Sequence, residues 1–329
     1  MNQPRNSSYY FSRATIIQIL PKHKPVNEVQ ATADGLERGF KVPSLGAHMS
    51  IAGGIHLAFD RLKEIQGNAL QIFTTNHRQW RSGKLSPEAI ELFKSRWEQT
   101  GGIPVASHGI YLVNLAARDE LILSRSITAL AEELMRCAAL GIEYLTMHPG
   151  AHLGEGTEAG LIHFVKNLDR AIETSRVESV SILIENTAGQ GSSLGSTFEE
   201  ISFILTNSGF GKTMGVCYDT AHGFAAGYDM RDEEAYSLTL SRFDEAIGID
   251  RLRFFHLNDS KRELGSRVDR HEHIGKGKIG LDGFRPLLND PRFRDHPMVL
   301  ETPKGKDLKE DKENMRVLRS LIRSGDQSR

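Results

Sequence analysis

Eight short apolar stretches along the chain each end in a polar residue. They include SLGAH, VSILIE and MVLE, and their last residues lie 28 to 45 positions apart. That spacing leaves room for one strand and one crossover helix each time. The terminal residues are His48, Asn76, His108, His148, Glu185, Asp219, His256 and Glu301. The pattern predicts an α/β fold, a single (β/α)8 TIM barrel over residues 44–303 with its site at the C-terminal ends of the strands.

The positions between the strands also mark individual helices. The stretch 126–140 carries apolar residues at helical spacing, and Gly141 follows as a C-cap. Further along, Ser196 precedes Glu199 by three residues, which is the spacing of a capping box. The sequence therefore predicts one helix over 126–140 and the start of another at Ser196.

The two ends of the chain do not follow this alternation. Residues 1–43 form an N-terminal extension, and its first 27 residues contain no acidic residue. A transit peptide for an organelle has that bias, but we favour a poorly ordered extension and expect a cytoplasmic protein. Residues 304–329 are highly charged. They predict a C-terminal surface helix followed by a frayed tail.

Composition narrows the class of protein. The chain has 41 basic and 42 acidic residues and a net charge of −1, which excludes a uniformly basic nucleic-acid-binding surface but allows a local patch. No run of 18 apolar residues occurs, so we expect no membrane span. Cys137 and Cys217 do not form a CxxC pair. We interpret them as buried thiols in a reducing compartment.

Most of the predicted strand ends carry residue types that bind metal ions. Zinc accepts histidine nitrogens and carboxylate oxygens. A single histidine at a strand end is more often a hydrogen-bonded structural residue, but six residues of metal-ligand type at equivalent strand ends are hard to explain that way. Burying so many ionisable groups together would be costly without cations. The six are His108, His148, Glu185, Asp219, His256 and Glu301.

Three further residues extend this set. His222 lies three residues after Asp219, just past a predicted strand end. Asp269 and His271 have i, i+2 spacing, so their side chains point the same way in an extended loop. The pattern around that pair by itself favours a solvated charged loop. Nine candidate ligands exceed the needs of one tetrahedral zinc and indicate a cluster of two or three metal ions.

Basic residues gather on two of the predicted barrel-top loops and could form a phosphate-binding rim. Glycine-rich segments also occur, but none has the GxGxxG or GxxxxGK[ST] form, so nucleotide binding is weakly supported. The basic residues are Arg78, Arg81, Lys84, Lys261, Arg262, Arg267, Arg270, Lys276 and Lys278.

Longer strings in the chain resemble the endonuclease IV family of apurinic/apyrimidinic (AP) endonucleases. The resemblance covers about residues 44–303, and its motifs are specific in combination. The strings are GAHMSIAGG (46–54), NHRQWR (76–81), SHGIYLVNL (107–115), HPGAHLGEG (148–156), IENTAGQGSSLG (184–195), CYDTAHGFAAGYD (217–229), FHLNDSKRELGSRVDRHEHIGKGKIG (255–280) and LET (300–302). The family is a zinc-dependent, xylose-isomerase-like (β/α)8 barrel. The extension 1–43 has no counterpart in its pattern.

The resemblance implies three Zn²⁺ ions per chain, because all nine ligand positions of the family's motifs are filled. One zinc would be held by His108, His148 and Glu185. Glu185 would bridge to a second zinc, which is also bound by Asp219, His256 and Glu301. The third would be held by His222, Asp269 and His271.

The resemblance also implies a DNA repair activity, namely base excision repair of duplex DNA that contains abasic sites. The family cuts the phosphodiester 5′ to the abasic site by zinc-bound hydroxide, leaving a 3′-hydroxyl and a 5′-deoxyribose phosphate. Glu185 would be the catalytic carboxylate near the attacking hydroxide. Arg78, Tyr111 and Leu112 match the family's DNA-probing residues. A 3′-phosphatase or 3′-phosphodiesterase side activity and a monomeric state are further expectations.

Two alternatives compete with this interpretation. The first is a metal-dependent sugar isomerase or epimerase on the same barrel. Such sites generally use fewer metals and a pocket closed around a small sugar, so Asp269, His271 and the basic residues argue against it. The second, from a different class, is a non-catalytic protein that binds abasic DNA. Tight binding without incision would be its signature.

Overall fold

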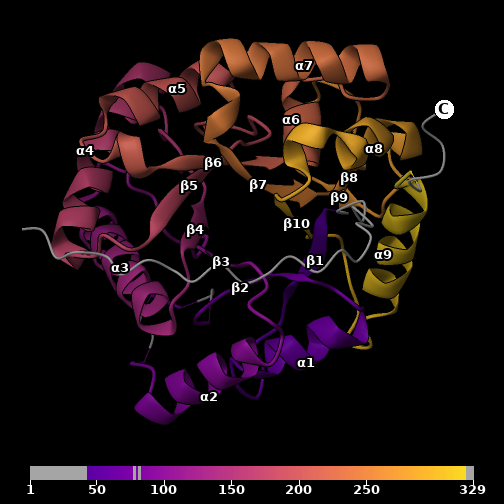
Figure 1. Cartoon of the computed structure of the whole chain (residues 1–329). Coiled ribbons are helices and arrows are strands. Elements are labelled where there is room, and N and C mark those ends of the chain that lie inside the picture. The colour runs from indigo at the N-terminus through magenta and orange to yellow at the C-terminus, as the bar shows by residue number, and fades with distance from the viewer. Residues whose placement is uncertain (1–42, 77–78, 81–82, 324–329) are drawn as a thin grey trace, which may run out of the picture. The chain divides into compact units, whose positions relative to one another are not determined.

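The computed structural model describes residues 43–76, 79–80 and 83–323, so the expectation for the N-terminal extension falls almost wholly outside the described residues. Eight parallel strands close into a barrel in the order β1-β10-β7-β6-β5-β4-β3-β2 (Figure 1). The predicted (β/α)8 barrel is therefore confirmed. Its strands are β1 Ser44–Met49, β2 Ala69–Ile72, β3 Val105–His108, β4 Tyr144–Met147, β5 Ser181–Glu185, β6 Gly215–Asp219, β7 Leu252–Leu257 and β10 Pro297–Leu300.

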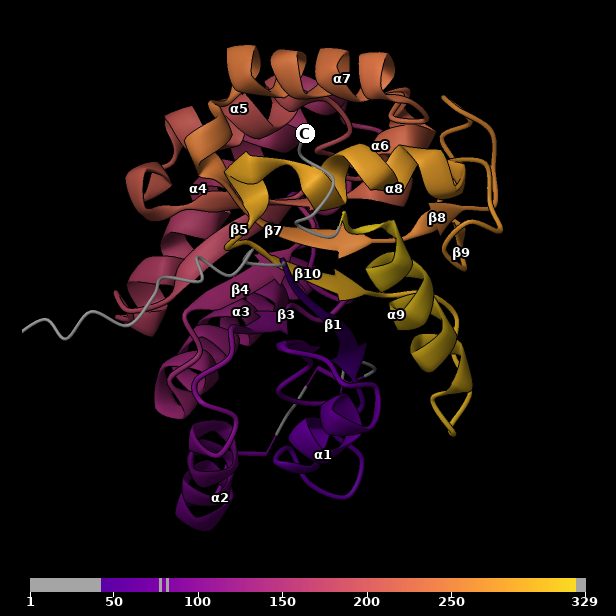
Figure 2. The ribbon, with the colours of Figure 1, turned by 45° about the vertical axis from the view of Figure 1, so that its right-hand side comes forward.

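Helices surround the barrel, and a short antiparallel ribbon of β8 and β9 extends from the end of β7 (Figure 2). Among the helices that the structure describes, none combines the length and apolar character needed to cross a membrane. The elements are α1 Leu57–Glu64, α2 Pro87–Glu98, α3 Glu120–Leu140, α4 Thr157–Ser175, α5 Phe198–Asn207, α6 Thr220–Ala226, α7 Glu233–Ala246, α8 Gly280–Asn289, α9 Lys309–Leu321, β8 Asp259–Ser260 and β9 His271–Glu272, with 3₁₀ turns at Gly211–Thr213, Ile249–Arg251 and Pro291–Phe293.

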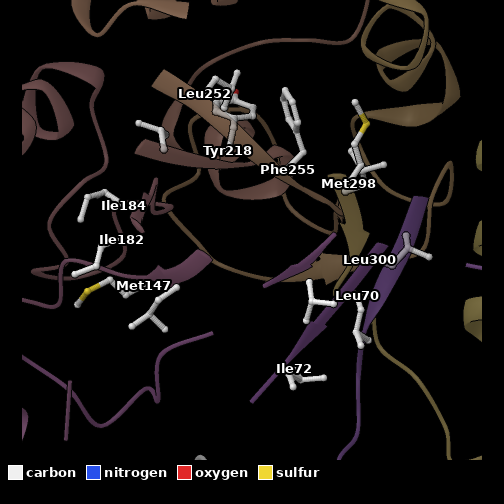
Figure 3. Close-up of a cluster of buried hydrophobic side chains, with 14 of the residues drawn as sticks. Leu70, Ile72, Met147, Ile182, Ile184, Tyr218, Leu252, Phe255, Met298 and Leu300 are labelled. Atoms are coloured by element: carbon white, nitrogen blue, oxygen red, sulfur yellow. The ribbon is translucent and has the colours of Figure 1, made fainter. Parts of the chain in front are cut away.

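The strands bury apolar side chains on both of their faces. Because successive side chains point to opposite faces, one set packs outward against the helices and the other fills the barrel. Leu70 and Ile72 of β2 belong to the outer set, part of which is drawn in Figure 3. The inner set forms a separate cluster, called here the apolar layer, of Ala69, Ala106, Leu183, Cys217, Phe254 and Val299.

A second layer lies inside the barrel, two residues beyond the apolar layer on the six strands that contribute to it and hence nearer their C-terminal ends. Alternation points these side chains to the same face as the apolar layer, so polar groups stack directly above apolar ones. We call this set the polar layer: His48, Gln71, His108, His148, Glu185, Asp219, His256 and Glu301. The polar layer therefore lies at the C-terminal end of the barrel, directly next to the apolar layer that fills the barrel interior.

Helix α9 is more than a surface helix. Its Met315 and Leu318 are fully buried, and α9 packs against α8 and β1. The Asn314 side chain accepts the N–H of Ile274 (3.0 Å) and donates to the hydroxyl of Thr302 (2.9 Å). One buried amide therefore joins α9 to two segments that immediately follow candidate metal ligands. The predicted frayed tail lies mostly beyond the described residues.

Candidate metal centre

The carboxylate of Glu185 lies at the centre of the polar layer and contacts four histidines. Its Oε2 lies 3.1 Å from Nε2 of His108 and 3.2 Å from Nε2 of His148. Its Oε1 lies 3.0 Å from Nδ1 of His256 and 3.2 Å from Nδ1 of His222. Glu185 is fully buried. A buried carboxylate needs compensating partners, and here each oxygen has two.

The ionisable groups of this cluster shift one another's pKa values. Burial alone would raise the pKa of Glu185, but His148 and His256 and the hydrogen bonds of the cluster lower it well below its usual range. Burial alone would lower the pKa of His256, but neighbouring Cys217, Glu301 and Glu185 raise it well above the usual value. The carboxylates therefore favour the charged form of His256, and the histidines favour the charged form of Glu185.

Two further carboxylates face His256. Oε2 of Glu301 lies 3.3 Å, and Oδ2 of Asp219 3.8 Å, from its Nδ1. Asp219 ends β6 and also caps α6, because its Oδ1 accepts the N–H of His222 (2.8 Å). The helix starts directly at the strand end for this reason. It carries His222 back over the polar layer.

A third group of ligand types lies at the rim, where α6 meets the β8–β9 ribbon. Nε2 of His222 lies 3.2 Å from Oδ2 of Asp269, and Nε2 of His271 lies 3.4 Å from Oδ1 of the same carboxylate. Burial would lower the pKa of His222, but Asp219, Asp269 and Glu185 raise it well above its usual value. The two loop residues that the local pattern assigned to a solvated loop thus face the cluster.

Asp259 folds that loop over the barrel. Its carboxylate is fully buried and accepts five backbone N–H groups, from Ser260, Gly275, Gly277, Ile279 and Gly280, at 2.8 to 3.3 Å. A Cβ on Gly277 would lie 2.4 Å from Oδ1 of Asp259, so only glycine fits there. Asp259 therefore fixes the path of the segment that carries Asp269 and His271.

The ligand types fall into three groups whose donor atoms lie within 4.8 Å of one another. They are His108 with His148 and Glu185; Glu185 with Asp219, His256 and Glu301; and Asp219 with His222 and His271. Imidazole nitrogens and carboxylate oxygens are donors that zinc accepts, so this set fits a cluster of divalent metal ions. Two groups coincide with the implied zinc sites. The third contains Asp219 where the resemblance implies Asp269, although Asp269 contacts both histidines of that group.

An exposed aromatic side chain stands beside the cluster. Tyr111, in the turn after β3, is 62% exposed, and its ring centroid lies 5.5 Å from that of His108. Leu112 follows in the same turn and is half-buried. Tyr111, Glu301 and His271 line a cavity of about 680 Å³ that opens beside the cluster. Arg78, the third predicted DNA-probing residue, lies outside the described residues, and nothing is placed for it.

The basic residues of the β8–β9 region are exposed, but two of them have carboxylate partners. Nζ of Lys278 lies 2.7 Å from Glu263, and Nζ of Lys261 lies 3.5 Å from Glu272. Surface pairs of this kind are weak, so they leave these lysines able to exchange partners. Arg81 is not among the described residues. The exposed members that are described are Lys84, Lys261, Arg262, Arg267, Arg270, Lys276 and Lys278.

The second strand differs from its prediction. It ends at Ile72 rather than at Asn76, and Gln71 is the residue of β2 that enters the polar layer. Gln71 is fully buried and contacts His48, His256 and Glu301. Asn76 instead lines the cavity beside the cluster. The signal for Gln71 was present in the sequence, as a long amide inside the apolar run ALQIF.

Comparisons with known proteins agree with this fold. The family model of the xylose isomerase-like TIM barrel matches residues 59–321. The chain is 47% identical over 285 residues to a probable endonuclease 4 of Chloroflexus aurantiacus, a match that covers 87% of this chain and 100% of that protein. The structure is similar to that of endonuclease IV from Thermus thermophilus, with a TM-score of 0.76 and 38% identity over 85% of this chain and 98% of that one.

A D-tagatose 3-epimerase-like protein is also similar, with a TM-score of 0.66 over 84% of this chain and 96% of that chain. Its identity of 17% carries the likeness no further than the fold. The two endonucleases, in contrast, are 47% and 38% identical to this chain, and the matches cover 100% and 98% of their own lengths. The chain therefore belongs to the endonuclease IV family of xylose isomerase-like TIM barrels.

Proposed function

We propose that this protein hydrolyses the phosphodiester 5′ to an abasic site in duplex DNA, leaving a 3′-hydroxyl and a 5′-deoxyribose phosphate. The observation that carries the proposal is the convergence of nine candidate metal ligands, with Glu185 at their centre, at the C-terminal end of the barrel. Membership of the endonuclease IV family supports a nuclease role for this site. The finer chemistry is inferred from the residues themselves.

The ligand set would hold three zinc ions. His108, His148 and Glu185 would bind one; Glu185, Asp219, His256 and Glu301 a second; and His222, Asp269 and His271 the third. When bound, zinc supplies Lewis-acid stabilisation of phosphoryl charge and lowers the pKa of water to near neutrality. Since the carboxylates and histidines of this set are already convergent, the chain would need little rearrangement to bind the metal ions.

The remaining roles fall to residues of the chain. Glu185, with both oxygens engaged, holds the ligands at fixed separations and is the carboxylate nearest the centre of the site. Asp219 orients His222 through the N-cap of α6. The phosphodiester, an anion, would approach through the 680 Å³ cavity, whose lining includes both Glu301 and Lys304. Exposed cations such as Arg267 and Arg270 would contact flanking phosphates.

Selection of abasic sites would come from access to the cluster. An abasic nucleotide has no base to unstack, so rotating it out of the helix costs less than rotating an intact one. Tyr111 and Leu112 stand in a turn beside the cluster and could enter the gap that the missing base leaves. Arg78 would act with them. An intact nucleotide would remain stacked and keep its phosphate away from the metal ions.

Incision of an end-labelled duplex with one tetrahydrofuran abasic analogue tests the proposal. We expect zinc-loaded protein, without added magnesium, to make a single cut 5′ to the analogue and to leave an end that a DNA polymerase extends. The same duplex with thymine at that position should stay intact. Tight binding without a cut would contradict the proposal in favour of a lesion-binding protein. Epimerisation of a ketohexose by protein that neither binds nor cuts the duplex would favour a sugar enzyme.

Further expectations accompany this proposal. The same site would remove 3′-phosphate or 3′-phosphodiester fragments from damaged ends, because these also present a phosphoryl group on a 3′ oxygen with no base on its 3′ side. The protein would act as a monomer on cytoplasmic DNA. Cys137 and Cys217 are buried free thiols, which is compatible with a reducing compartment.

A further inference from the structure

Two positions of the polar layer are not among the candidate ligands. Six of its eight side chains belong to the proposed metal sites, whereas β1 contributes His48 and β2 contributes Gln71. These two residues are register partners on neighbouring strands. Both lie next to Glu301, the ligand that follows the last strand of the barrel. They close the layer where the first and last strands meet.

Gln71 points into the barrel because its neighbours point out. Leu70 and Ile72, both labelled in Figure 3, belong to the outer cluster that includes residues of the helices, so alternation directs Gln71 to the interior. Its side chain is fully buried at 0% exposure. A buried amide with no partners would be costly, so its nitrogen and oxygen need hydrogen-bond partners inside the barrel.

All three amide contacts reach the cluster. The Oε1 atom lies 2.8 Å from Nε2 of His256. The Nε2 atom lies 2.6 Å from Oε1 of Glu301 and 3.0 Å from Nδ1 of His48. A carboxylate can only accept, so the amide nitrogen faces Glu301 and the amide oxygen faces His256. The amide oxygen can only accept in turn, so the Nε2 atom of His256 carries a hydrogen.

This contact decides which nitrogen of His256 is available as a ligand. With its hydrogen on Nε2, His256 presents Nδ1 to Glu185 at 3.0 Å and to Glu301 at 3.3 Å. Other histidines of the cluster are oriented by the main chain: Nδ1 of His108 donates to the carbonyl of Gly109 (2.7 Å). His256 is oriented by a side chain instead. A point substitution can therefore remove this constraint.

We propose that Gln71 is a positioning residue for the metal site formed by Glu185, Asp219, His256 and Glu301. Its amide oxygen fixes the tautomer of His256, and its amide nitrogen anchors Glu301. The inference rests on the proposed function only in that the cluster binds metal ions. Partners of this kind tune metal affinity, and their loss costs about 10- to 100-fold. The loss should be confined to the one site that both partners share.

The test uses Gln71→Leu, which has similar volume and no polar atoms, with Thr146→Val as the matched control. Thr146 is a buried barrel residue whose hydroxyl has no hydrogen-bond partner in the described structure. Both variants and the wild type are loaded with zinc and dialysed against graded chelator, and zinc per chain is measured. Thermal unfolding of the metal-free proteins is recorded in parallel.

We expect Gln71→Leu to lose one zinc per chain at about 10- to 100-fold less chelator than the wild type, while the other zinc ions stay bound. Thr146→Val should match the wild type throughout. Wild-type retention in Gln71→Leu would overturn the proposal. Loss of all zinc in one step, together with a lowered melting temperature of the metal-free protein, would also overturn it and assign Gln71 a purely structural role.

A second variant separates the two halves of the contact. Gln71→Glu keeps an oxygen acceptor for His256 but places a carboxylate oxygen against Glu301. We expect it to lose the same zinc ion as Gln71→Leu. Wild-type retention would show that Glu301 needs no anchor and would overturn that half of the proposal. Because these readouts need no DNA, failure of the wild type to cut abasic duplex would refute the proposed function and leave the result for Gln71 unaffected.

Discussion

His222 and His271 direct their Nε2 atoms to within 3.3 Å of each other, although they are 49 residues apart in the chain. One lies on α6 and the other on the β8–β9 ribbon. Both nitrogens also lie within 3.4 Å of the Asp269 carboxylate. Three donor groups from two separate segments thus share one point at the rim of the barrel.

Removing Asp269 should therefore empty the rim site selectively. We expect Asp269→Ala to bind one zinc ion fewer than the wild type and to incise abasic duplex at least about 100-fold more slowly, because one stabiliser of phosphoryl charge is lost. Zinc analysis and single-turnover incision measure the two effects. Asp282→Ala, an exposed carboxylate on α8, is the matched control. Full zinc content in Asp269→Ala would remove Asp269 from the ligand set.

Glu185 should be the most sensitive single residue. Glu185→Gln keeps the shape of the side chain but removes the charge that four histidines share. We expect incision to fall by about 1,000-fold or more, since both metal sites that use Glu185 are disturbed. Incision at saturating zinc measures this, and zinc per chain reports the cause. Turnover at the wild-type rate would refute the central role of Glu185.

The metal-free protein should be most stable near pH 6.5. Glu185 and Glu301 have pKa values well below the usual 4.5, so their contribution is present above that pH and is lost as pH falls. Burial lowers the pKa of His48 from 6.5 to about 4, so this residue reduces the stability of the folded state as the pH falls from 6.5 to about 4. His222 and His256 have pKa values well above 6.5, so their contribution is complete below pH 6.5 and is lost as pH rises.

Thermal unfolding of the metal-free protein between about pH 5 and pH 9 measures this dependence. We expect the melting temperature to rise up to about pH 6.5 and to decline above it. In zinc-loaded protein the decline should disappear, because metal binding requires neutral imidazoles and therefore favours higher pH. A melting temperature of the metal-free protein that keeps rising to pH 9 would mean that these histidines are neutral in the folded state.

Tyr111 should affect DNA binding more than metal binding. We expect Tyr111→Ala to raise the KM for abasic duplex about 10-fold, as loss of one stacking contact of about 1–3 kcal/mol allows, with zinc content unchanged. Leu238→Ala is a control of similar character, because Leu238 is a 54% exposed apolar side chain on α7. Loss of zinc from Tyr111→Ala would instead show that the ring supports His108 and His148, whose rings it contacts.

The barrel was predictable because its signal is local and repeated. Each barrel strand is a short and largely buried run, and several helices carry a side-chain cap, among them α2, α3, α5 and α7. Gly141 ends α3 in the left-handed conformation, as expected for a C-cap. The predicted position of a helix cap is off by one residue where two neighbouring residues can both act as the N-cap. Thr197 caps α5 rather than Ser196, since its hydroxyl accepts the N–H of Glu200 (3.2 Å).

The parts that were not predictable depend on contacts between distant segments. The local pattern around Asp269 and His271 favours a solvated loop, and the buried carboxylate of Asp259 is what folds that loop back. The second strand was extended to Asn76 because its apolar run continues through Phe73. Only the barrel register shows that Gln71 lies beside His48 and that the strand ends at Ile72.

The closure of the barrel has a consequence for how the enzyme is made. Strand β10, whose next residue is Glu301, pairs with β1 at the opposite end of the chain. During synthesis, a nascent chain that already carries His108, His148 and Glu185 therefore still lacks Glu301, which is one of the ligands proposed for the site that Glu185 would bridge. Long-range pairing of this kind forms late. Under the proposed function, the full set of metal ions would therefore bind only after synthesis of the chain is complete, and prematurely terminated fragments should not cut abasic DNA.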